Sequence, residues 1–242
     1  MEILTQKEYS FTLNDSACSV TAIIVAGGSA SRMKGIDKLF ADLAGKPVLV
    51  HTLLAYQGCR SIDKIVVAAR PDVVADVQRL CEQYGISKLS AVVEGGATRS
   101  ESVKNAVDAV DDDCGYIAIA DGARPLTSQQ DIEATVEAAV RFGAAACAVR
   151  VTDTIKVTDT DNFIQSTPDR SALWAAQTPQ IFKADRYRQA LAAHYGEFTD
   201  DCAMMEADGV RVKLVEGSYT NIKITTPTDL VIAQAFLTEG IL

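Results

Sequence analysis

Short apolar runs alternate with segments of helical periodicity along most of this chain. Five runs have the pattern of buried strands, at residues 21–26, 64–69, 89–94, 116–121 and 144–149. Between them, apolar side chains recur at helical spacing near residues 47–59, 72–84, 99–110 and 128–142. Strands that alternate with helices predict an α/β fold, in which helices cover both faces of a mostly parallel sheet.

Two of the predicted helices begin with a recognisable capping sequence. Thr98 stands three residues before Glu101, which is the spacing of a capping box, and Ser128 stands in the same relation to Asp131. Apolar residues at helical spacing follow both pairs. The two helices are therefore expected to begin directly after Thr98 and Ser128.

The alternation breaks between residues 151 and 182. Residues 152–157 and 162–166 flank a segment of Thr and Asp residues that is typical of a hairpin turn. A projecting pair of strands is marginally stable alone, so this arm, about residues 151–172, is expected to pack on something, and a second subunit is the obvious candidate. Helices near 184–194, 200–208 and 227–237 and a strand at 210–215 are predicted to follow.

The chain shows no sign of a division into several domains. Residues 1–19 are polar and lack periodicity, which predicts an N-terminal extension. No linker-like or low-complexity stretch interrupts residues 20–242, so we expect them to form one domain that includes the arm.

Composition and charge narrow the function classes. The 242 residues are 48% hydrophobic, enough for one large core, and carry a formal net charge of -9. An acidic chain lacks the electrostatic footprint of a DNA- or RNA-binding protein. No membrane-length apolar stretch and no signal-peptide pattern are present. Six scattered cysteines without a C-x-x-C pair indicate reduced thiols rather than a zinc site, so we expect a cytoplasmic protein.

A glycine-rich loop directly follows the first predicted strand. It runs Ala26-Gly27-Gly28-Ser29-Ala30-Ser31-Arg32-Met33, and Lys38 comes soon after. Small residues let backbone N–H groups approach a ligand closely, and two cations within one loop's reach suit a triphosphate. The loop fits neither the dinucleotide-binding nor the Walker pattern, and an ordinary turn between a strand and a helix remains the alternative.

Two later strands end in similar residues. Residues 89–94 lead into Gly95-Gly96 and the helix start near Arg99 and Ser102. Residues 116–121 end in Asp121-Gly122-Ala123-Arg124, where the carboxylate suits a hydrated Mg²⁺ or a ligand hydroxyl. A capped tight turn and a surface Asp–Arg pair are the plainer readings. Because ligands of such sheets bind at the carboxyl ends of the strands, the three loops together favour a shared site.

Two clusters lie further along the chain. Arg170 precedes Trp174 and the sequence Gln177-Thr178-Pro179-Gln180, and its guanidinium could bind a phosphate. The second cluster is Asn221-Ile222-Lys223-Ile224, preceded by Thr199-Asp200-Asp201. Lys223 alternates with the two isoleucines and is expected to face away from them.

In combination and in this order, the motifs resemble one enzyme family. The motifs are A-G-G-S-A-S-R-M followed by Lys38, E-G-G-A-T-R-S-E-S-V, D-G-A-R-P, D-T-I-K, D-R-S-A-L-W-A-A-Q-T-P-Q, F-T-D-D and N-I-K-I-T-T-P-T-D-L. Over about residues 20–238 they resemble the 2-C-methyl-D-erythritol 4-phosphate cytidylyltransferases, and the ribitol-5-phosphate cytidylyltransferases share most of them. The resemblance implies a three-layer, Rossmann-like nucleotidyltransferase fold. It also implies CTP as co-substrate, Mg²⁺, and a homodimer in which each projecting arm completes the neighbour's site.

The resemblance also implies roles for matching residues. The residues implied to hold the triphosphate are Ala26, Gly27, Gly28, Arg32 and Lys38. Those implied to border the cytosine and ribose are Gly95, Gly96, Arg99 and Ser102. The residues implied to lie between the nucleotide and the sugar phosphate are Asp121, Gly122 and Arg124. Asp121 is also the candidate metal ligand. The residues implied to receive the sugar phosphate are Thr154, Lys156, Arg170, Thr178 and Lys223. The resemblance implies that the opposite subunit supplies Thr154, Lys156 and Arg170.

Three functions remain open at this point. The protein would transfer CMP from CTP to methylerythritol phosphate, transfer it to ribitol 5-phosphate, or bind a nucleotide without catalysis. Retention of Arg32, Lys38, Arg170 and Lys223, which are assigned to catalysis, argues against the inactive alternative. The two acceptors are both small polyol phosphates, so the sequence separates the first two functions poorly.

Overall fold

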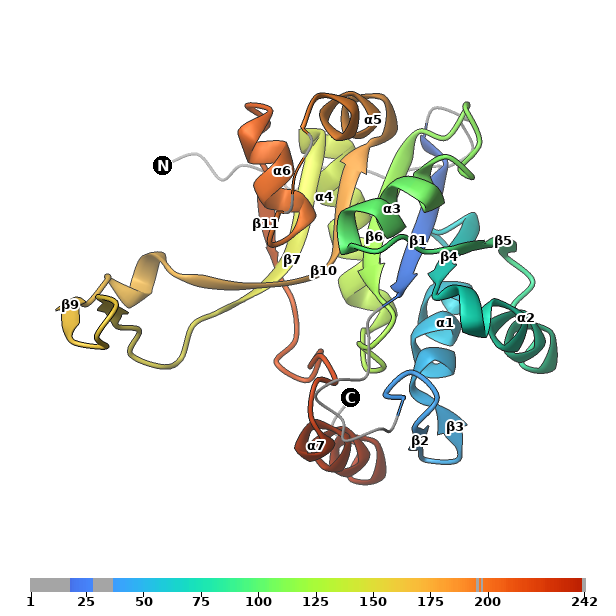
Figure 1. The fold of residues 1–242 in the computed structure, drawn as a ribbon, viewed down its shortest axis with the longest axis horizontal. Coiled ribbons are helices and arrows are strands. Elements are labelled where there is room, and N and C mark those ends of the chain that lie inside the picture. Colours follow the sequence, from blue (N-terminus) through green and yellow to red (C-terminus); the bar gives the residue numbers. More distant parts are fainter. Residues whose placement is uncertain (1–17, 28–36, 195, 197, 241–242) are drawn as a thin grey trace, which may run out of the picture.

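The fold is taken from a computed structural model that describes residues 18–27, 37–194, 196 and 198–240 (Figure 1). Most of the predicted N-terminal extension, residues 1–17, lies outside these ranges, and so do Gly28 and Arg32. Within them, no helix is long and apolar enough to cross a lipid bilayer.

A mostly parallel sheet forms the middle of the described protein. Its strand order is β11 (Lys213–Glu216), β7 (Ala144–Arg150), β10 (Trp174–Lys183), β6 (Tyr116–Asp121), β1 (Val20–Ala26), β4 (Lys64–Ala69) and β5 (Leu89–Glu94). β10 is antiparallel to both of its neighbours, whereas the other neighbouring pairs are parallel. The predicted α/β sheet is confirmed.

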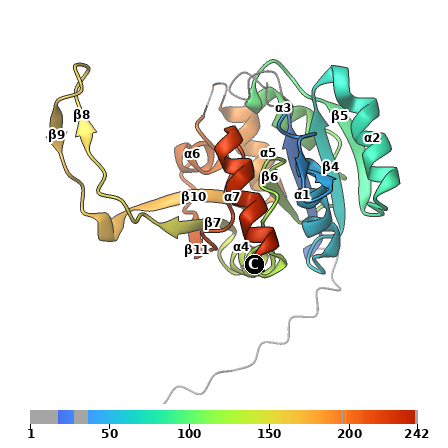
Figure 2. The same cartoon turned by 90° about the horizontal axis from the view of Figure 1, so that it is seen from below.

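Helices cover both faces of the sheet, so the protein has three layers (Figures 1 and 2). One face carries α1 (Val48–Gly58), α2 (Val74–Gln83), α4 (Gln129–Phe142) and α7 (Pro227–Thr238), and the other α3 (Arg99–Val107), α5 (Ala184–Ala193) and α6 (Asp201–Ala207). Strand β1 serves both cores because its side chains alternate: Ala22 and Ile24 pack on the first face and Ile23 on the second. Three short elements complete the body: β2 (Asp42–Leu43), β3 (Lys46–Pro47) and η2 (Pro71–Val73).

One central strand was not predicted from the sequence. β10 occupies part of the segment in which the alternation breaks, and it lies between β6 and β7. The strand contains Pro179, a residue that normally argues against a central strand because it cannot donate to the ladder. The structure accommodates Pro179 where the β10–β7 register shifts, between Ala176 and Gln180.

The arm projects away from the three layers, as the sequence predicts (Figures 1 and 2). Its hairpin is much shorter than expected, because only β8 (Val157–Thr158) and β9 (Ile164–Ser166) pair. Residues 152–156 have no regular structure, so the predicted strand at 152–157 is wrong for all but its last residue. A short helical turn, η3 (Arg170–Ala172), leads back to β10.

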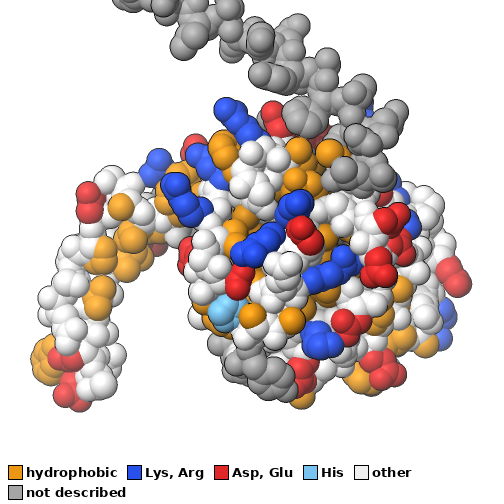
Figure 3. Space-filling view, turned by 90° about the horizontal axis from the view of Figure 1, so that it is seen from above, with side chains coloured by type: hydrophobic (Ala, Val, Ile, Leu, Met, Phe, Trp, Pro, Cys, Tyr) orange, Lys and Arg blue, Asp and Glu red, His pale blue; other side chains and the backbone are white. Residues whose placement is uncertain are grey.

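Large apolar side chains are exposed on the arm. They are Ile155, Val157, Phe163 and Ile164, with exposed fractions of 41% to 72%. Figure 3 shows hydrophobic side chains on the surface of the arm. Apolar groups gathered on a projecting element are typical of a surface that another protein covers.

The helix starts agree with the capping sequences. The Thr98 hydroxyl accepts from the Glu101 amide, and the Glu101 carboxylate accepts from the Thr98 amide, which completes the predicted box. At α4 the Ser128 hydroxyl accepts from the Asp131 amide at 2.9 Å. Both caps satisfy N–H groups that have no partner within the helix.

We predict that Ser128→Ala lowers the free energy of unfolding by about 1 kcal/mol, because it removes the cap of α4. Urea denaturation of both proteins at one protein concentration measures the difference. Ser128→Asp is the matched control, because aspartate also caps helices and should restore most of the stability. Identical midpoints for wild type and Ser128→Ala would contradict this role.

Candidate active site

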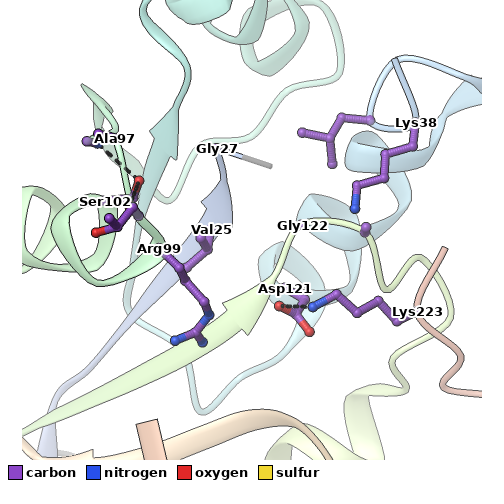
Figure 4. Close-up of a pocket in the computed structure, with 13 residues that line it drawn as sticks. Val25, Gly27, Lys38, Ala97, Arg99, Ser102, Asp121, Gly122 and Lys223 are labelled. Carbon is purple, nitrogen blue, oxygen red and sulfur yellow. Dashed lines mark hydrogen bonds and ion pairs between the residues drawn. The ribbon is translucent and has the colours of Figure 1, made fainter. Parts of the chain in front are cut away.

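A cavity of about 280 Å³ lies at the carboxyl ends of β1 and β6 (Figure 4). Its described lining comprises Val25, Gly27, Lys38, Leu39, Gly96, Ala97, Thr98, Arg99, Ser102, Asp121, Gly122, Ala123 and Lys223. The cavity therefore gathers all three loops that the sequence placed at one sheet edge, together with Lys223 from far along the chain. Figure 4 shows Lys38 and Lys223 reaching in from one side and Arg99 from the other.

The two glycine-rich loops meet at the Ser102 side chain. Its hydroxyl donates to the Thr98 carbonyl at 2.9 Å and accepts from the Gly96 amide at 3.0 Å. A Cβ atom on Gly95 would lie 2.8 Å from this hydroxyl, and one on Gly27 would lie 3.2 Å away. A side chain at position 95 would have to displace this hydroxyl, which favours glycine there. Ser102 thus shapes the wall of the cavity.

Asp121 is the carboxylate at the centre of the site. It ends β6, is 9% exposed, and pairs with Lys223 Nζ at 3.0 Å and Arg124 Nε at 3.1 Å. Burial alone would raise the pKa of Asp121, but the charges of Lys223 and Arg124 outweigh burial and hold this pKa below its ordinary value. The pairs stabilise the folded state at neutral pH, and this contribution is lost as the pH falls through the lowered pKa.

Arg99 is held by a buried carboxylate of its own. Its guanidinium donates to Asp201 Oδ2 at 2.6 Å, and the Tyr187 hydroxyl donates to Asp201 Oδ1 at 2.5 Å. Burial would lower the pKa of Arg99, but the charge of Asp201 outweighs it and the pKa is raised. Asp201 is 5% exposed, and Tyr187 is fully buried beneath it. Arg99 is therefore a fixed positive charge at the start of α3.

A second cavity adjoins the first. The two share Arg99, Asp121 and Lys223, and the second is also lined by Arg124, Ala176, Gln177, Thr178, Gln180, Thr199 and Asp200. Thr178 lies beside the central carboxylate, because its hydroxyl accepts from the Asp121 amide at 3.1 Å. Two compartments that meet at Lys223 and Asp121 can hold two ligands with their reacting ends together.

Positive charge is concentrated at this edge of an acidic protein. Lys38, Arg99, Arg124 and Lys223 line the two cavities, against the carboxylates of Asp121 and Asp200. The chain as a whole carries a net charge of -9. Such local focusing attracts anionic ligands and favours phosphate groups over neutral ones. Among the described lining residues none is histidine or cysteine.

The predicted arm residues do not reach these cavities. Arg170 Nη1 donates to the Thr152 carbonyl at 2.8 Å, and Lys156 Nζ donates to the Thr167 hydroxyl at 2.8 Å. Both bonds lie within the arm, as does Thr154. The chain's own fold thus separates these three residues from Lys38, Lys223 and the other predicted contacts.

Several site residues carried no assigned role in the sequence analysis. Tyr187 gave no signal, because a tyrosine in an amphipathic helix is usually a core residue. Asp201 belongs to the sequence Thr199-Asp200-Asp201 described above. Its ion pair with Arg99 could not be predicted, because the two residues are 102 positions apart in the sequence. Gln180 is a further case: its amide donates to Asp200 Oδ2 at 2.9 Å and its carbonyl accepts from the Cys202 amide at 3.0 Å. These two bonds hold the start of α6 against the sheet.

The described residues offer little for a metal ion by themselves. No group of three or more His, Cys, Asp or Glu side chains in the described ranges could hold one. Asp121 is the one carboxylate in the described lining of the first cavity, and each of its oxygens already accepts from a cation. A cation here would have to take most of its ligands from a bound nucleotide and water, as Mg²⁺ commonly does.

Comparison with known proteins agrees with this geometry. Residues 20–239 match the family model described as IspD, 2-C-methyl-D-erythritol 4-phosphate cytidylyltransferase. The protein of that name from Caldanaerobacter subterraneus subsp. tengcongensis is 45% identical over 90% of this chain and 99% of its own length. The protein of that name from Syntrophotalea carbinolica is also 45% identical, over 90% of this chain and 96% of its own length.

Solved structures give the same result. The 4-diphosphocytidyl-2C-methyl-D-erythritol synthase of Anaerococcus prevotii aligns with a TM-score of 0.80 at 30% identity, covering 92% of this chain and 99% of the other. The 2-C-methyl-D-erythritol 4-phosphate cytidylyltransferase of Thermus thermophilus aligns with a TM-score of 0.74 at 32% identity, covering 91% and 99%. The chain therefore belongs to the 2-C-methyl-D-erythritol 4-phosphate cytidylyltransferase family.

Proposed function

We propose that this protein transfers CMP from CTP to 2-C-methyl-D-erythritol 4-phosphate, a step of non-mevalonate isoprenoid biosynthesis. The products are pyrophosphate and 4-diphosphocytidyl-2-C-methyl-D-erythritol. The observation that carries the proposal is the pair of adjoining cavities that share Lys223 and Asp121. Two phosphorylated substrates placed in them would meet at Lys223.

CTP belongs in the first cavity. Its triphosphate would contact the loop at Ala26, Gly27 and Gly28, with Arg32 and Lys38 placed against the developing charge and the leaving pyrophosphate. Its cytosine and ribose would lie toward Gly95, Gly96, Arg99 and Ser102. The start of α3 supports this placement, because its backbone and the half-buried Arg99 present positive charge toward the cavity.

The acceptor phosphate belongs in the second cavity, near Arg124, Thr178 and Lys223. Its oxygen would attack the α-phosphorus of CTP in line, and the bond to pyrophosphate would break. A phosphate monoester is mostly dianionic near neutral pH, since its second pKa is about 6, so the attack needs no general base. The absence of histidine from the described lining fits this chemistry. Catalysis then consists of positioning and charge stabilisation.

Mg²⁺ is the cation we propose for this reaction. It would arrive with CTP, and Asp121, the carboxylate in the described lining of the first cavity, would contact it by exchanging one of its bonds to Lys223 or Arg124. When bound, it would neutralise phosphate charge and orient the triphosphate. Glycine at position 122 lets the backbone beside Asp121 stay close to β1, because a Cβ atom there would lie 3.1 Å from the Val25 carbonyl oxygen.

We further propose that the protein acts as a homodimer joined through the arms. The exposed Ile155, Val157 and Phe163 would then be covered, and Thr154, Lys156 and Arg170 would reach the second cavity of the partner. In this arrangement the arm residues would bind the acceptor of the partner subunit, although the chain's own fold keeps them away from its own cavities. The Arg170 guanidinium would hold the acceptor phosphate from the side opposite Lys223.

Pyrophosphate release measured with CTP and each of two acceptors tests the proposed function. We expect fast release with 2-C-methyl-D-erythritol 4-phosphate, and little with ribitol 5-phosphate at the same concentration. Preference for ribitol 5-phosphate would assign the protein to the related activity. Release with neither acceptor would favour an inactive nucleotide-binding protein.

Lys38→Ala should lower turnover by on the order of 100- to 1000-fold, because it removes one preorganised charge from the transition state. Steady-state kinetics at saturating CTP and acceptor measure the loss. Lys104→Ala is the control, since Lys104 is exposed and pairs with Asp108 outside the two cavities. Near-normal turnover of Lys38→Ala would remove Lys38 from this role.

Arg170→Ala should weaken use of the acceptor far more than binding of CTP, which separate titrations of the two substrates would resolve. Equal losses for both substrates would contradict the assignment.

Mixing Arg170→Ala with Lys38→Ala subunits tests whether the site is shared. Each mixed dimer would contain one complete site, so random exchange should restore about a quarter of wild-type activity. No recovery, in a mixture shown by mass spectrometry to contain mixed dimers, would place Arg170 in its own chain's site.

A further inference from the structure

Asn221 is a buried residue to which the mechanism above gives no role. It is fully buried, and each of its polar groups has a partner. Its side-chain NH₂ donates to the Thr178 carbonyl at 3.0 Å, and its Oδ1 accepts from the Thr127 hydroxyl at 2.9 Å. Its backbone carbonyl accepts from Arg124 Nη1 at 2.7 Å, and its amide donates to the Ser218 carbonyl at 3.1 Å.

These bonds join three separate segments. Thr127 and Arg124 belong to the loop between β6 and α4, Thr178 belongs to β10, and Asn221 itself lies two residues before Lys223. Arg124, Thr178 and Lys223 all line the second cavity. The Asn221 side chain therefore binds the backbone of Thr178, and its backbone carbonyl binds the Arg124 guanidinium. Thr178, Arg124 and the nearby Lys223 are the three residues that we assign to the acceptor phosphate.

The segment that carries Lys223 is held by individual hydrogen bonds, among them those of Asn221. Residues 217–225 form neither helix nor strand, so no regular ladder fixes their position. Apart from the bonds of Asn221, the segment is tied to the loop after β6 by the Ile224 amide, which donates to the Ala123 carbonyl at 2.8 Å. The Lys223 side chain is 41% exposed, and its contact with Asp121 is made by the terminal Nζ atom. Its place in the cavity depends on where the backbone of this segment lies.

We propose that Asn221 is a positioning residue for the acceptor half of the site. It holds Lys223, Arg124 and Thr178 at the mutual spacing that the acceptor phosphate requires, without touching the substrate itself. The proposal rests on the proposed function and adds the residue that fixes the geometry of the second cavity. A displacement of a reacting group by about 1 Å can cost about 100-fold in rate, so a lost anchor should be visible in the kinetics.

Asn221→Ala and Thr127→Val are the test variants. Asn221→Ala should lower kcat/KM for the acceptor by about 100-fold, through both a higher KM and a lower kcat. The Kd of CTP, measured by calorimetry, should stay within about threefold of wild type because most of the first cavity's described lining, including Lys38, Gly96 and Ser102, lies outside the segment that Asn221 anchors. Thr127→Val removes a hydroxyl that bonds to Asn221 Oδ1 and to the Arg124 carbonyl, but it keeps the Asn221 bond to Thr178, so it should shift the same parameters by about tenfold less.

Thr135→Val is the matched control for lost stability. Thr135 is fully buried on α4, and its hydroxyl donates to the Asp131 carbonyl within the helix, away from both cavities. This variant should unfold at lower urea and keep wild-type constants for both substrates. If Asn221→Ala does not fold, the acceptor constants of Thr127→Val decide the question.

Two results would overturn the proposal. One is a set of Asn221→Ala and Thr127→Val proteins that lose stability but keep wild-type acceptor kinetics. The other is an equal loss of CTP and acceptor binding, which would indicate general damage to the fold. Wild-type turnover with 2-C-methyl-D-erythritol 4-phosphate, measured first, separates these results from failure of the proposed function, because that failure would leave little turnover with this acceptor even in wild type.

Discussion

The buried Asp121 carboxylate is the constraint on which the candidate site depends. It ends the central strand β6, and it binds Arg124 from the following loop and Lys223 from a segment 102 residues away. A carboxylate this deeply buried stays ionised because the two cations outweigh the cost of removing it from water. The carboxylate in turn holds the positive charges of Lys223 and Arg124 beside the cavities of an otherwise acidic chain. Arg99 and Asp201 form a second such pair on the opposite wall.

These fixed charges explain how a protein without a described histidine or cysteine in the site could catalyse transfer between two polyanions. The obstacle is mutual repulsion and charge growth at phosphorus, and preorganised cations oppose both. The need for several cations around the reacting phosphates also explains the role of the arm in our proposal. Under that proposal one chain would supply the nucleotide cavity and half of the acceptor cavity, while Arg170 lies on an element that its own fold holds away from both.

Local signals predicted most of the fold. The strands at 64–69, 89–94 and 116–121 and the capped start of α3 follow from apolar runs and side-chain spacing, which neighbouring residues determine. Strand β10 was missed because Pro179 contradicts its central place, and the arm strands were overestimated because strand propensity depends on packing that an exposed arm lacks. In the site, the loops at β1, β5 and β6 were predictable from topology. The anchoring by Asn221 and Tyr187 was not, since it depends on contacts between residues far apart in sequence.

A crystal structure of the protein with CTP and Mg²⁺ tests the central claim most directly. The account predicts the triphosphate in the first cavity, with phosphate oxygens within hydrogen-bond distance of Lys38 and the cytidine toward α3. It also predicts the α-phosphorus facing the second cavity, with the partner's arm closing that side. A nucleotide bound elsewhere, or a triphosphate that leaves Lys38 and Lys223 on separate surfaces, would contradict the account.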